Sequence, residues 1–275
     1  MNKSFKLLYP NFKPKACTFS YDDGVLQDSC VIEIFNKFGL KGTFNLNSGQ
    51  SGETKFREGY DCSHLDLSNN IYLYKGHEIA THTFSHPHME TLTMNEQFNE
   101  YSKDIENLSD LYNQKIIGSA YPYGTYSNTT LKVLEKNGIK YSRTTRSTYN
   151  FRRPYNFLLW HPTIHHNDER LSAVVNEFYQ TEEELALLYI WGHSYEFALQ
   201  QNLDSFESTC EELSKHSDIW FATNGDIYEY IKAAELAYVR NDYLINPSDC
   251  KVYFEINKIV VCLNPHQSKF IGVTK

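Results

Sequence analysis

Residues 16–24 read ACTFSYDDG, a short apolar and β-prone run that ends in two aspartates and a glycine. Consecutive residues of a strand point to opposite faces, so two neighbouring carboxylates cannot both line one pocket while the strand stays regular. Gly24 allows the chain to turn, which lets both Asp22 and Asp23 reach the end of the strand. One carboxylate can then bind a cation while the other stays free as a base. The alternative is a solvated turn with an aspartate cap.

Strand-length apolar runs and helical spacings alternate along the chain from this run to residue 237. The predicted strands cover residues 16–21, 43–46, 77–81, 116–120, 139–143, 157–160, 187–191 and 219–222. Strands that alternate with helices form a parallel sheet, and eight of them indicate an α/β fold that closes as a (β/α) barrel. In the tail, two β-prone runs joined by Asn257-Lys258 predict a hairpin. We therefore expect a barrel domain over residues 1–237 and a β-hairpin extension packed on it over residues 238–275.

Composition narrows the class of protein. The 275 residues include 26 Lys and Arg against 34 Asp and Glu, a formal net charge of −8, which disfavours nucleic acid and anionic membranes as partners. No stretch approaches the ~18 apolar residues that span a bilayer, and residues 1–17 contain no apolar signal region. The six cysteines form no Cys-x-x-Cys motif. These features predict a reduced, cytoplasmic protein; an export signal removed before residue 1 would leave the same sequence, and the oligomeric state stays open.

Polar residues follow the predicted strands at their carboxyl ends, the rim where a parallel barrel assembles its active site. They are Asp22, Asp23, His82, Tyr123, Arg143 and His193. His82 and His86 stand four residues apart and can share one metal ion, and His161 and His165 form a second pair with this spacing. Either pair can also be a coincidence of surface or core residues. An aspartate with two histidines fits a catalytic zinc site with open positions for water and substrate.

Two further motifs suit the chemistry of such a site. In residues 121–124, YPYG, the proline fixes the backbone and the glycine permits an unusual turn, so the Tyr123 N–H could act as an oxyanion donor. The alternative is an ordinary turn before a helix capped by Ser127. His193 follows an apolar strand in WGHSYEF, and a half-buried histidine with a carboxylate neighbour can serve as a general acid. A core histidine bonded to backbone is the alternative there.

Together these segments resemble the polysaccharide deacetylase family, the NodB-like domain of carbohydrate esterase family 4. The family's first motif, Thr-Phe-Asp-Asp-Gly, is matched by residues 20–24 in its last three positions and its aromatic. Its second motif, His-(Ser/Thr)-x-x-His, is matched fully by residues 82–86. Residues 122–124 match the end of the third motif, and residues 188–193 match the apolar strand that ends in a histidine. The resemblance spans about residues 15–235, is that of a divergent branch, and implies a distorted (β/α) barrel of seven or eight strands.

The resemblance also implies an activity: metal-dependent hydrolysis of acetyl groups on sugars, mostly N-acetyl, which is cleavage of a non-peptide carbon–nitrogen bond. Asp22 would be the base and His193 the acid, and Tyr123 would offer its backbone N–H to the oxyanion. The implied metal ligands are Asp23, His82 and His86. Zinc is the expected ion, with cobalt, nickel and manganese as alternatives. The implied partner is an acetylated sugar or oligosaccharide, whose chain length and linkage stay open.

The sequence departs from the family in two motifs. The third-motif arginine falls at Ala120, and Arg143 at the end of the next predicted strand is our candidate replacement. The fourth motif, with its Asp and Trp, has no clear counterpart. Since 15% of residues are aromatic and rings stack on sugar faces, we expect substrate-binding roles for some of them. The substrate-binding candidates are Arg143, Trp160, Trp191 and Tyr21.

Two alternative functions stay open, and the departures favour the first of them. One is a catalytically weak or inactive member of the family that only binds sugar through an aromatic rim. The other is a hydrolase of cyclic amides or ureides on the same scaffold, as some relatives are. The presence together of the base, the acid, the oxyanion donor and the metal ligands argues against the inactive member; these positions are Asp22, His193, Tyr123, Asp23, His82 and His86.

Overall fold

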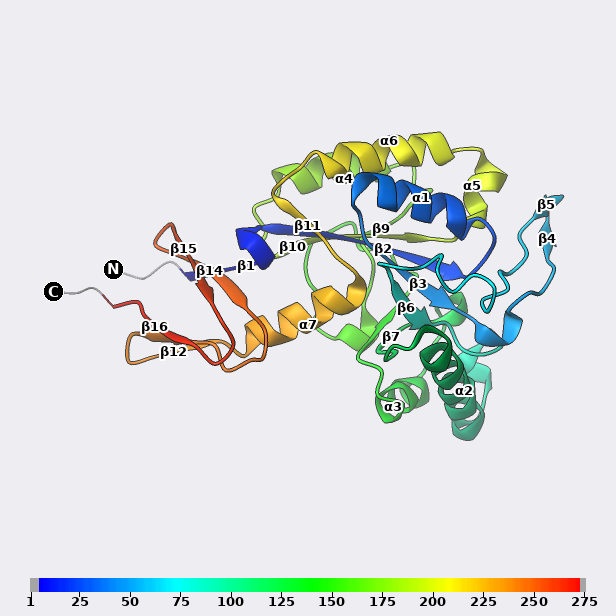
Figure 1. The fold of residues 1–275 in the computed structure, drawn as a ribbon, viewed down its shortest axis with the longest axis horizontal. Helices are drawn as coiled ribbons and strands as arrows, with labels where there is room; N and C mark the ends of the chain where they lie inside the picture. Colours follow the sequence, from blue (N-terminus) through cyan, green and yellow to red (C-terminus); the bar gives the residue numbers. More distant parts are fainter. Residues whose placement is uncertain (1–4, 273–275) are drawn as a thin grey trace.

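The computed structural model describes residues 5–272 and centres on a curled parallel sheet with helices outside it (Figure 1). The strand order is β8-β7-β6-β3-β2-β10-β9, and β11 pairs with the first residues of β2. The strands are β2 (Lys15–Asp23), β3 (Gly42–Leu46), β6 (Glu78–Thr81), β7 (Gly118–Ala120), β8 (Tyr141–Arg143), β9 (Ile164–His165), β10 (Ala186–Gly192) and β11 (Ile219–Phe221). All residues of β2 and β10 are buried, as expected for central parallel strands covered on both faces.

Residues 160–165 connect the two edges of this sheet. Trp160 forms a parallel bridge to Arg143 at the end of β8, and β9 pairs with β10 a few residues later. The sheet therefore curls into a distorted barrel, which confirms the predicted fold class. The predicted strand over residues 157–160 is wrong, because Phe157–Leu159 forms a 3-10 turn. The side chain of Asn156 accepts the N–H of Leu158 and so favours a turn over an extended chain.

Helices connect the strands as the sequence pattern predicts. They are α1 (Asp28–Phe38), α2 (Met94–Tyr112), α3 (Asn128–Lys136), α4 (Leu171–Gln180), α5 (Tyr195–Gln200), α6 (Leu203–Ser214) and α7 (Asn224–Glu235). Gly39 ends α1 in the left-handed conformation, with φ of 69°, and Ser127 caps α3. In Figure 1, α1, α4 and α6 lie on one side of the barrel and α2 and α3 on the other. No helix among residues 5–272 is long and apolar enough to cross a bilayer.

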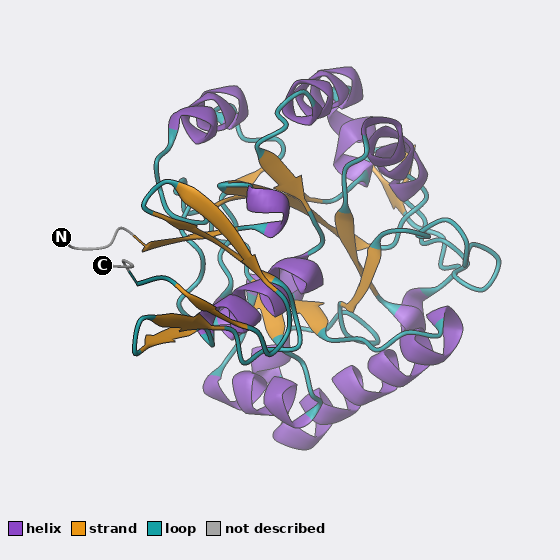
Figure 2. Ribbon diagram, turned by 60° about the vertical axis from the view of Figure 1, so that its left-hand side comes forward, coloured by secondary structure: helices purple, strands orange, loops and turns teal. Residues whose placement is uncertain are grey.

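The tail forms small antiparallel sheets. The predicted hairpin is confirmed, since β14 (Val252–Ile256) pairs with β15 (Ile259–Leu263) across Asn257 and Lys258, whose φ values are 50° and 67°. The sequence did not predict that β1 (Phe5–Leu8) would pair with β14. A second sheet joins β12 (Tyr238–Arg240), β13 (Tyr243–Ile245) and β16 (Ser268–Phe270). Figure 2 shows these sheets together at the left of the molecule; the division into domains at residue 237 stays a prediction.

One more hairpin lies on the opposite side of the molecule in Figure 1. It pairs β4 (Phe56–Arg57) with β5 (Tyr60–Asp61), and both strands are mostly exposed. The guanidinium carbon of Arg57 lies 4.3 Å from the ring centre of Tyr195 in α5. This cation–π contact holds the hairpin against the helix that follows β10.

A buried carboxylate on α2 holds the end of β6 in place. The backbone N–H of Ser48 donates to Asp104 at 2.7 Å, and the hydroxyl of Thr81 donates to its other oxygen. Thr81 Oγ1 in turn accepts the N–H of Thr83 at 3.1 Å. Burial raises the pKa of Asp104 to about 7, although these donors lower it.

This raised pKa predicts a pH-dependent stability. The folded state favours the protonated form of Asp104. Its contribution to the free energy of unfolding is greatest below the pKa of ~3.9 in the unfolded chain, and it is lost as the pH rises through about 7. Between pH 4 and pH 8 we expect the free energy of unfolding to fall less in Asp104→Asn than in the wild type. The two falls should differ by up to about 4 kcal/mol. Denaturant titrations across this pH range measure the difference. Asp110→Asn, an exposed carboxylate on the same helix, is the control, and equal pH slopes for wild type and Asp104→Asn would refute the assignment.

Candidate active site

The polar residues predicted for the rim meet at the carboxyl ends of the parallel strands. Asp22 and Asp23 end β2, His82 follows β6, Arg143 ends β8 and His193 follows β10. Side chains from strands that are far apart in the sequence are therefore neighbours. This is the edge at which a parallel barrel places its chemistry.

The turn at the end of β2 places both carboxylates in one cluster. Asp23 has φ of 77° and Gly24 has φ of 67°, so the alternation of the strand is broken at Asp23 itself. Asp22 Oδ2 lies 3.9 Å and Asp23 Oδ1 lies 3.7 Å from Nε2 of the same residue, His82. A side chain at position 24 would also meet the Leu46 side chain at 2.9 Å. Glycine is therefore required at this turn for both its conformation and its size.

Asp23, His82 and His86 direct three ligand atoms at one point. His82 Nε2 and His86 Nε2 lie 3.2 Å apart, and Asp23 Oδ1 lies 3.7 Å and 3.6 Å from them. The Nδ1 of His82 lies 2.9 Å from the Ala120 carbonyl, which fixes its proton on Nδ1 and leaves a lone pair on Nε2. Bonds of about 2.0–2.1 Å in a tetrahedral zinc site give ligand separations near ~3.3 Å.

Asp23 Oδ1 gives an independent sign that a cation belongs here. This oxygen is buried and has no hydrogen-bond partner among the described residues. Burial alone would raise its pKa, but the surrounding histidines, His193 first, lower it to about 2. The Asp23 oxygen and the Nε2 lone pair of His82 both face Nε2 of His86, at 3.6 Å and 3.2 Å. The residues therefore fit a divalent metal ion.

Asp22 is held apart from this triad by other partners. Its Oδ1 accepts a hydrogen bond from Asn45 at 2.8 Å, and its Oδ2 forms a buried ion pair with Arg143. Burial alone would raise the pKa of Asp22, but Arg143 and then His82 outweigh it and lower the pKa. Asp22 is therefore a charged carboxylate whose orientation is fixed from two sides. The sequence analysis missed Asn45, which lies beside Asp22 only because β3 pairs with β2 in this register.

His193 lies between Asp22 and Glu196. Its Nε2 is 3.9 Å from Asp22 Oδ2, and its Nδ1 is 3.3 Å from Glu196 Oε1. Burial alone would lower the pKa of His193, but the Glu196 hydrogen bond and then the two aspartates raise it to about 9. The ring is half-buried and cationic at neutral pH. It is therefore able to donate a proton beside Asp22.

Arg143 and Trp191 support the cluster from behind. Both are buried, and the guanidinium carbon of Arg143 lies 4.3 Å from the Trp191 ring centre. The side chain of Arg143 contacts Asp22, so its predicted contact with substrate is wrong, because it is fully enclosed. Its predicted place as the replacement for the motif arginine at position 120 agrees with this geometry.

Two other predicted substrate contacts are also wrong. Tyr21 is fully buried and packs against Phe35 and Phe44. Trp160 is buried against the rings of Tyr141 and Tyr189. Neither ring can reach a sugar, because both are almost fully buried. Their positions beside rim motifs in the sequence did not distinguish core rings from exposed ones.

Tyr123 is the exposed aromatic of the rim, with 56% of its surface accessible. Its backbone has φ of 57°, which confirms an unusual turn in this motif. The ring stacks on the His88 ring, with the two ring centres 3.9 Å apart, and makes an edge contact with the His86 ring, whose centre is 4.5 Å away. The oxyanion role of its N–H stays a prediction.

The second predicted histidine pair does not form a unit. His161 Nδ1 bonds to Thr144 Oγ1 at 2.6 Å, whereas Nε2 of His165 lies 3.2 Å from Glu196 Oε2. His165 instead groups with His166 and Glu196. The sequence analysis paired His165 with His161 and missed His166 and Glu196 as site residues; the signal for Glu196 was its place three residues after His193.

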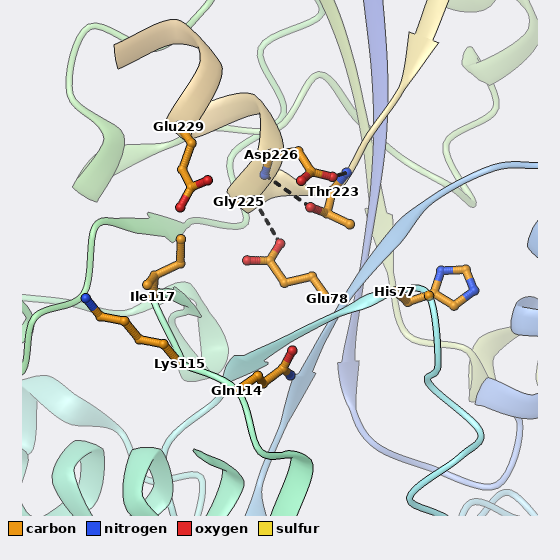
Figure 3. A pocket seen from close by; sticks show the side chains of 10 residues that line it. His77, Glu78, Gln114, Lys115, Ile117, Thr223, Gly225, Asp226 and Glu229 are labelled. Carbon is orange, nitrogen blue, oxygen red and sulfur yellow. Dashed lines mark hydrogen bonds between the residues drawn. The ribbon is translucent and has the colours of Figure 1, made fainter. Parts of the chain in front are cut away.

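Figure 3 shows a hollow at the other end of the barrel, of about 300 Å³. Glu78, the first residue of β6, accepts the N–H of Gly225 there at 2.8 Å, at the start of α7. The strand β6 thus separates this hollow from His82, which follows its carboxyl end. The contact stabilises the amino end of α7, since a carboxylate satisfies a helix N–H there.

Residues 10–142 match the family model for polysaccharide deacetylase. Among curated proteins, a peptidoglycan deacetylase of Helicobacter pylori is 24% identical over 111 residues, which cover 40% of this chain and 34% of that protein. The chain spans less than half the length of the curated relatives that it matches.

Two solved structures are similar to this chain in fold. A candidate polysaccharide deacetylase from Mycobacterium smegmatis has a TM-score of 0.59 at 14% identity, over 86% of this chain and 97% of that one. A mutant of a Bacillus anthracis carbohydrate esterase family 4 pseudoenzyme, with restored enzymatic activity, has a TM-score of 0.51 at 15% identity, over 81% and 70%. At these identities the likeness is one of fold.

The triad predicts where a metal ion binds. His82→Ala removes a ligand whose tautomer is fixed, so we expect its zinc affinity to fall by at least roughly 100-fold, beyond the 10–100-fold cost of outer-shell changes. Isothermal titration of chelator-treated protein measures the affinity. His161→Ala is the matched control and should bind as the wild type does. Equal losses in both variants, or a loss in His161→Ala alone, would contradict the assignment.

Proposed function

Because residues 10–142 match the polysaccharide deacetylase family model, we propose that this chain is a metal-dependent hydrolase that removes acetyl groups, chiefly N-acetyl, from a carbohydrate. One observation carries the proposal. A charged carboxylate, Asp22, and a cationic imidazole, His193, flank a triad with converging ligand atoms. Hydrolysis of an amide needs a base for water and an acid for the leaving nitrogen, and this cluster offers one of each.

The base side of the reaction depends on Asp22. A divalent ion held by Asp23, His82 and His86 would polarise the acetyl carbonyl and make a water molecule more acidic. Asp22 accepts a proton from the attacking water as the new carbon–oxygen bond forms. Arg143 and Asn45 keep the carboxylate from rotating, so it does not compete with Asp23 for the cation. The two adjacent aspartates therefore have different tasks.

The acid side depends on His193. Its Nε2–H gives a proton to the leaving nitrogen while the carbon–nitrogen bond breaks, because an amine anion cannot leave unprotonated. The N–H of Tyr123 is the proposed donor to the oxyanion, a kind of contact worth roughly 3–4 kcal/mol. The exposed ring of the same tyrosine, stacked on His88, offers a flat face on which a sugar can lie.

An inactive, sugar-binding member is the second candidate, since a pseudoenzyme is among the structures of similar fold. The geometry favours the enzyme. Arg143 pairs with Asp22 in place of the third-motif arginine, which is Ala120 in this chain. Glu196 places a carboxylate beside His193, the proposed acid. A protein that only bound sugar would have no use for a buried ion pair behind an ionised aspartate.

Asp22→Asn tests the base directly. We expect the variant to bind zinc as the wild type does, because Asp22 is not one of the triad, and to release acetate about 10²–10⁴-fold more slowly. Acetate release from N-acetylchitooligosaccharides and from O-acetylated xylan is measured, together with metal content. Unchanged acetate release would show that Asp22 is not the base. Loss of the metal would show that Asp22 is a metal ligand, as Asp23 is proposed to be.

A further inference from the structure

Three imidazoles converge on the carboxylate of Glu196. Oε1 lies 3.3 Å from Nδ1 of His193, while Oε2 lies 3.2 Å from Nε2 of His165 and 2.9 Å from Nε2 of His166. The backbone N–H of His193 also donates to Oε2 at 3.2 Å. Burial alone would raise the pKa of Glu196, but His165 and then the other two histidines hold it well below its usual range.

This group could be a second metal site or a hydrogen-bonded clamp, and the tautomer of His165 decides between them. Its Nδ1 accepts the backbone N–H of Asn167 at 3.1 Å, so the proton of the neutral ring is on Nε2. That N–H faces Glu196 and leaves no lone pair for a metal. In His82 the arrangement is reversed, with the proton on Nδ1 and the lone pair on Nε2. The two histidine clusters of this barrel therefore differ in chemistry.

His166 follows the same rule. Its Nδ1 lies 3.1 Å from the hydroxyl of Tyr21, and burial raises the pKa of that phenol well above its usual value, so the hydroxyl stays a donor. When Nδ1 accepts from Tyr21, the ring proton is on Nε2, which lies beside Glu196. Tyr21, which is excluded from the substrate site by its burial, thus orients a histidine of the clamp.

We propose that Glu196 is the positioning residue for His193, and that His165 and His166 hold Glu196 in the one orientation that this requires. Glu196 takes the Nδ1–H of His193, which leaves Nε2 directed at the side of Asp22, 3.9 Å away. The rings of Trp191 and Tyr195 lie beside the imidazole, with their ring centres 6.0 Å and 5.2 Å from its centre. This inference rests on the proposed function, because it assigns a partner to the proposed acid.

The role has a chemical consequence. His193 gives its Nε2 proton to the leaving nitrogen, and the negative charge of Glu196 stabilises the imidazolium before that transfer. A leaving group that departs without a proton does not need this help. An N-acetyl sugar, whose amine must be protonated, depends on Glu196. A nitrophenyl acetate, whose phenolate leaves as an anion, does not.

Glu196→Gln separates these two substrates. The amide keeps an acceptor oxygen and removes the charge, so we expect kcat on penta-N-acetylchitopentaose to fall by roughly 10²–10⁴-fold. Turnover of 4-nitrophenyl acetate should change by less than about 3-fold, a difference that a merely structural role would not produce. Asp168→Asn is the control, since Asp168 lies two residues after His166 and contacts Tyr149 and Arg170 instead. Equal losses on both substrates would overturn the positioning role.

Two further measurements complete the test. In a His193→Ala background, Glu196→Gln should cause no additional loss on the N-acetyl substrate, whereas an additive loss would show that Glu196 acts elsewhere. Nitrogen NMR of zinc-loaded protein should find a proton on Nδ1 of His193 in the wild type and a smaller protonated fraction in Glu196→Gln. Unchanged protonation would overturn the inference. If the zinc-loaded wild type released no acetate from any sugar, the proposed function would fail, and the NMR comparison would still decide the role of Glu196.

Discussion

Two adjacent carboxylates on the central strand of a barrel must face the same side, and the rest of the site depends on how the chain achieves this. β2 pairs with β3 and β11 along one edge and with β10 along the other, so the strand is held on both sides, and its last two residues pair with β3. The left-handed backbone at Asp23 and Gly24 then breaks the strand's alternation. A regular strand would direct one of the two carboxylates away from the rim.

Once both carboxylates face the rim, different partners separate their roles. Asp22 is buried against Arg143, and a buried charge is tolerable only when it is paired. Asp23 has an oxygen without a donor that faces two imidazole nitrogens. The first environment keeps a carboxylate ionised and oriented, and the second is suited to a cation. Side chains at the ends of β8 and β6, strands far from β2 in the sequence, therefore decide which aspartate does which task.

Local motifs predicted the part of this site that depends on local chemistry. Asp22, Asp23, His82 and His86 lie in short segments whose residue types already indicate a turn and a metal site. The barrel followed from alternating patterns, because each strand and helix carries its own periodicity. The 3-10 turn after Asn156 was missed because a short apolar run fits a strand and a turn equally well.

The remaining errors concern contacts between distant segments. Glu196 gains its role from His165 and His166, which the strand pairing of β9 with β10 places beside it. Tyr21 and Trp160 lie beside rim motifs in the sequence, yet the curvature of the sheet encloses them. Likewise, β1 contributes to the tail through a pairing with β14 across almost the whole chain. Sequence periodicity describes which face of a strand is apolar, but not which neighbours will cover it.

The central claim is that one metal ion, bound by Asp23, His82 and His86, completes a site whose base and acid are already in place. The most direct test titrates chelator-treated protein with zinc and follows acetate release from an N-acetylchitooligosaccharide. The account predicts no release without metal, a rise in proportion to zinc, and a plateau at one equivalent. Release without metal, or a rise that continues to two equivalents, would contradict it.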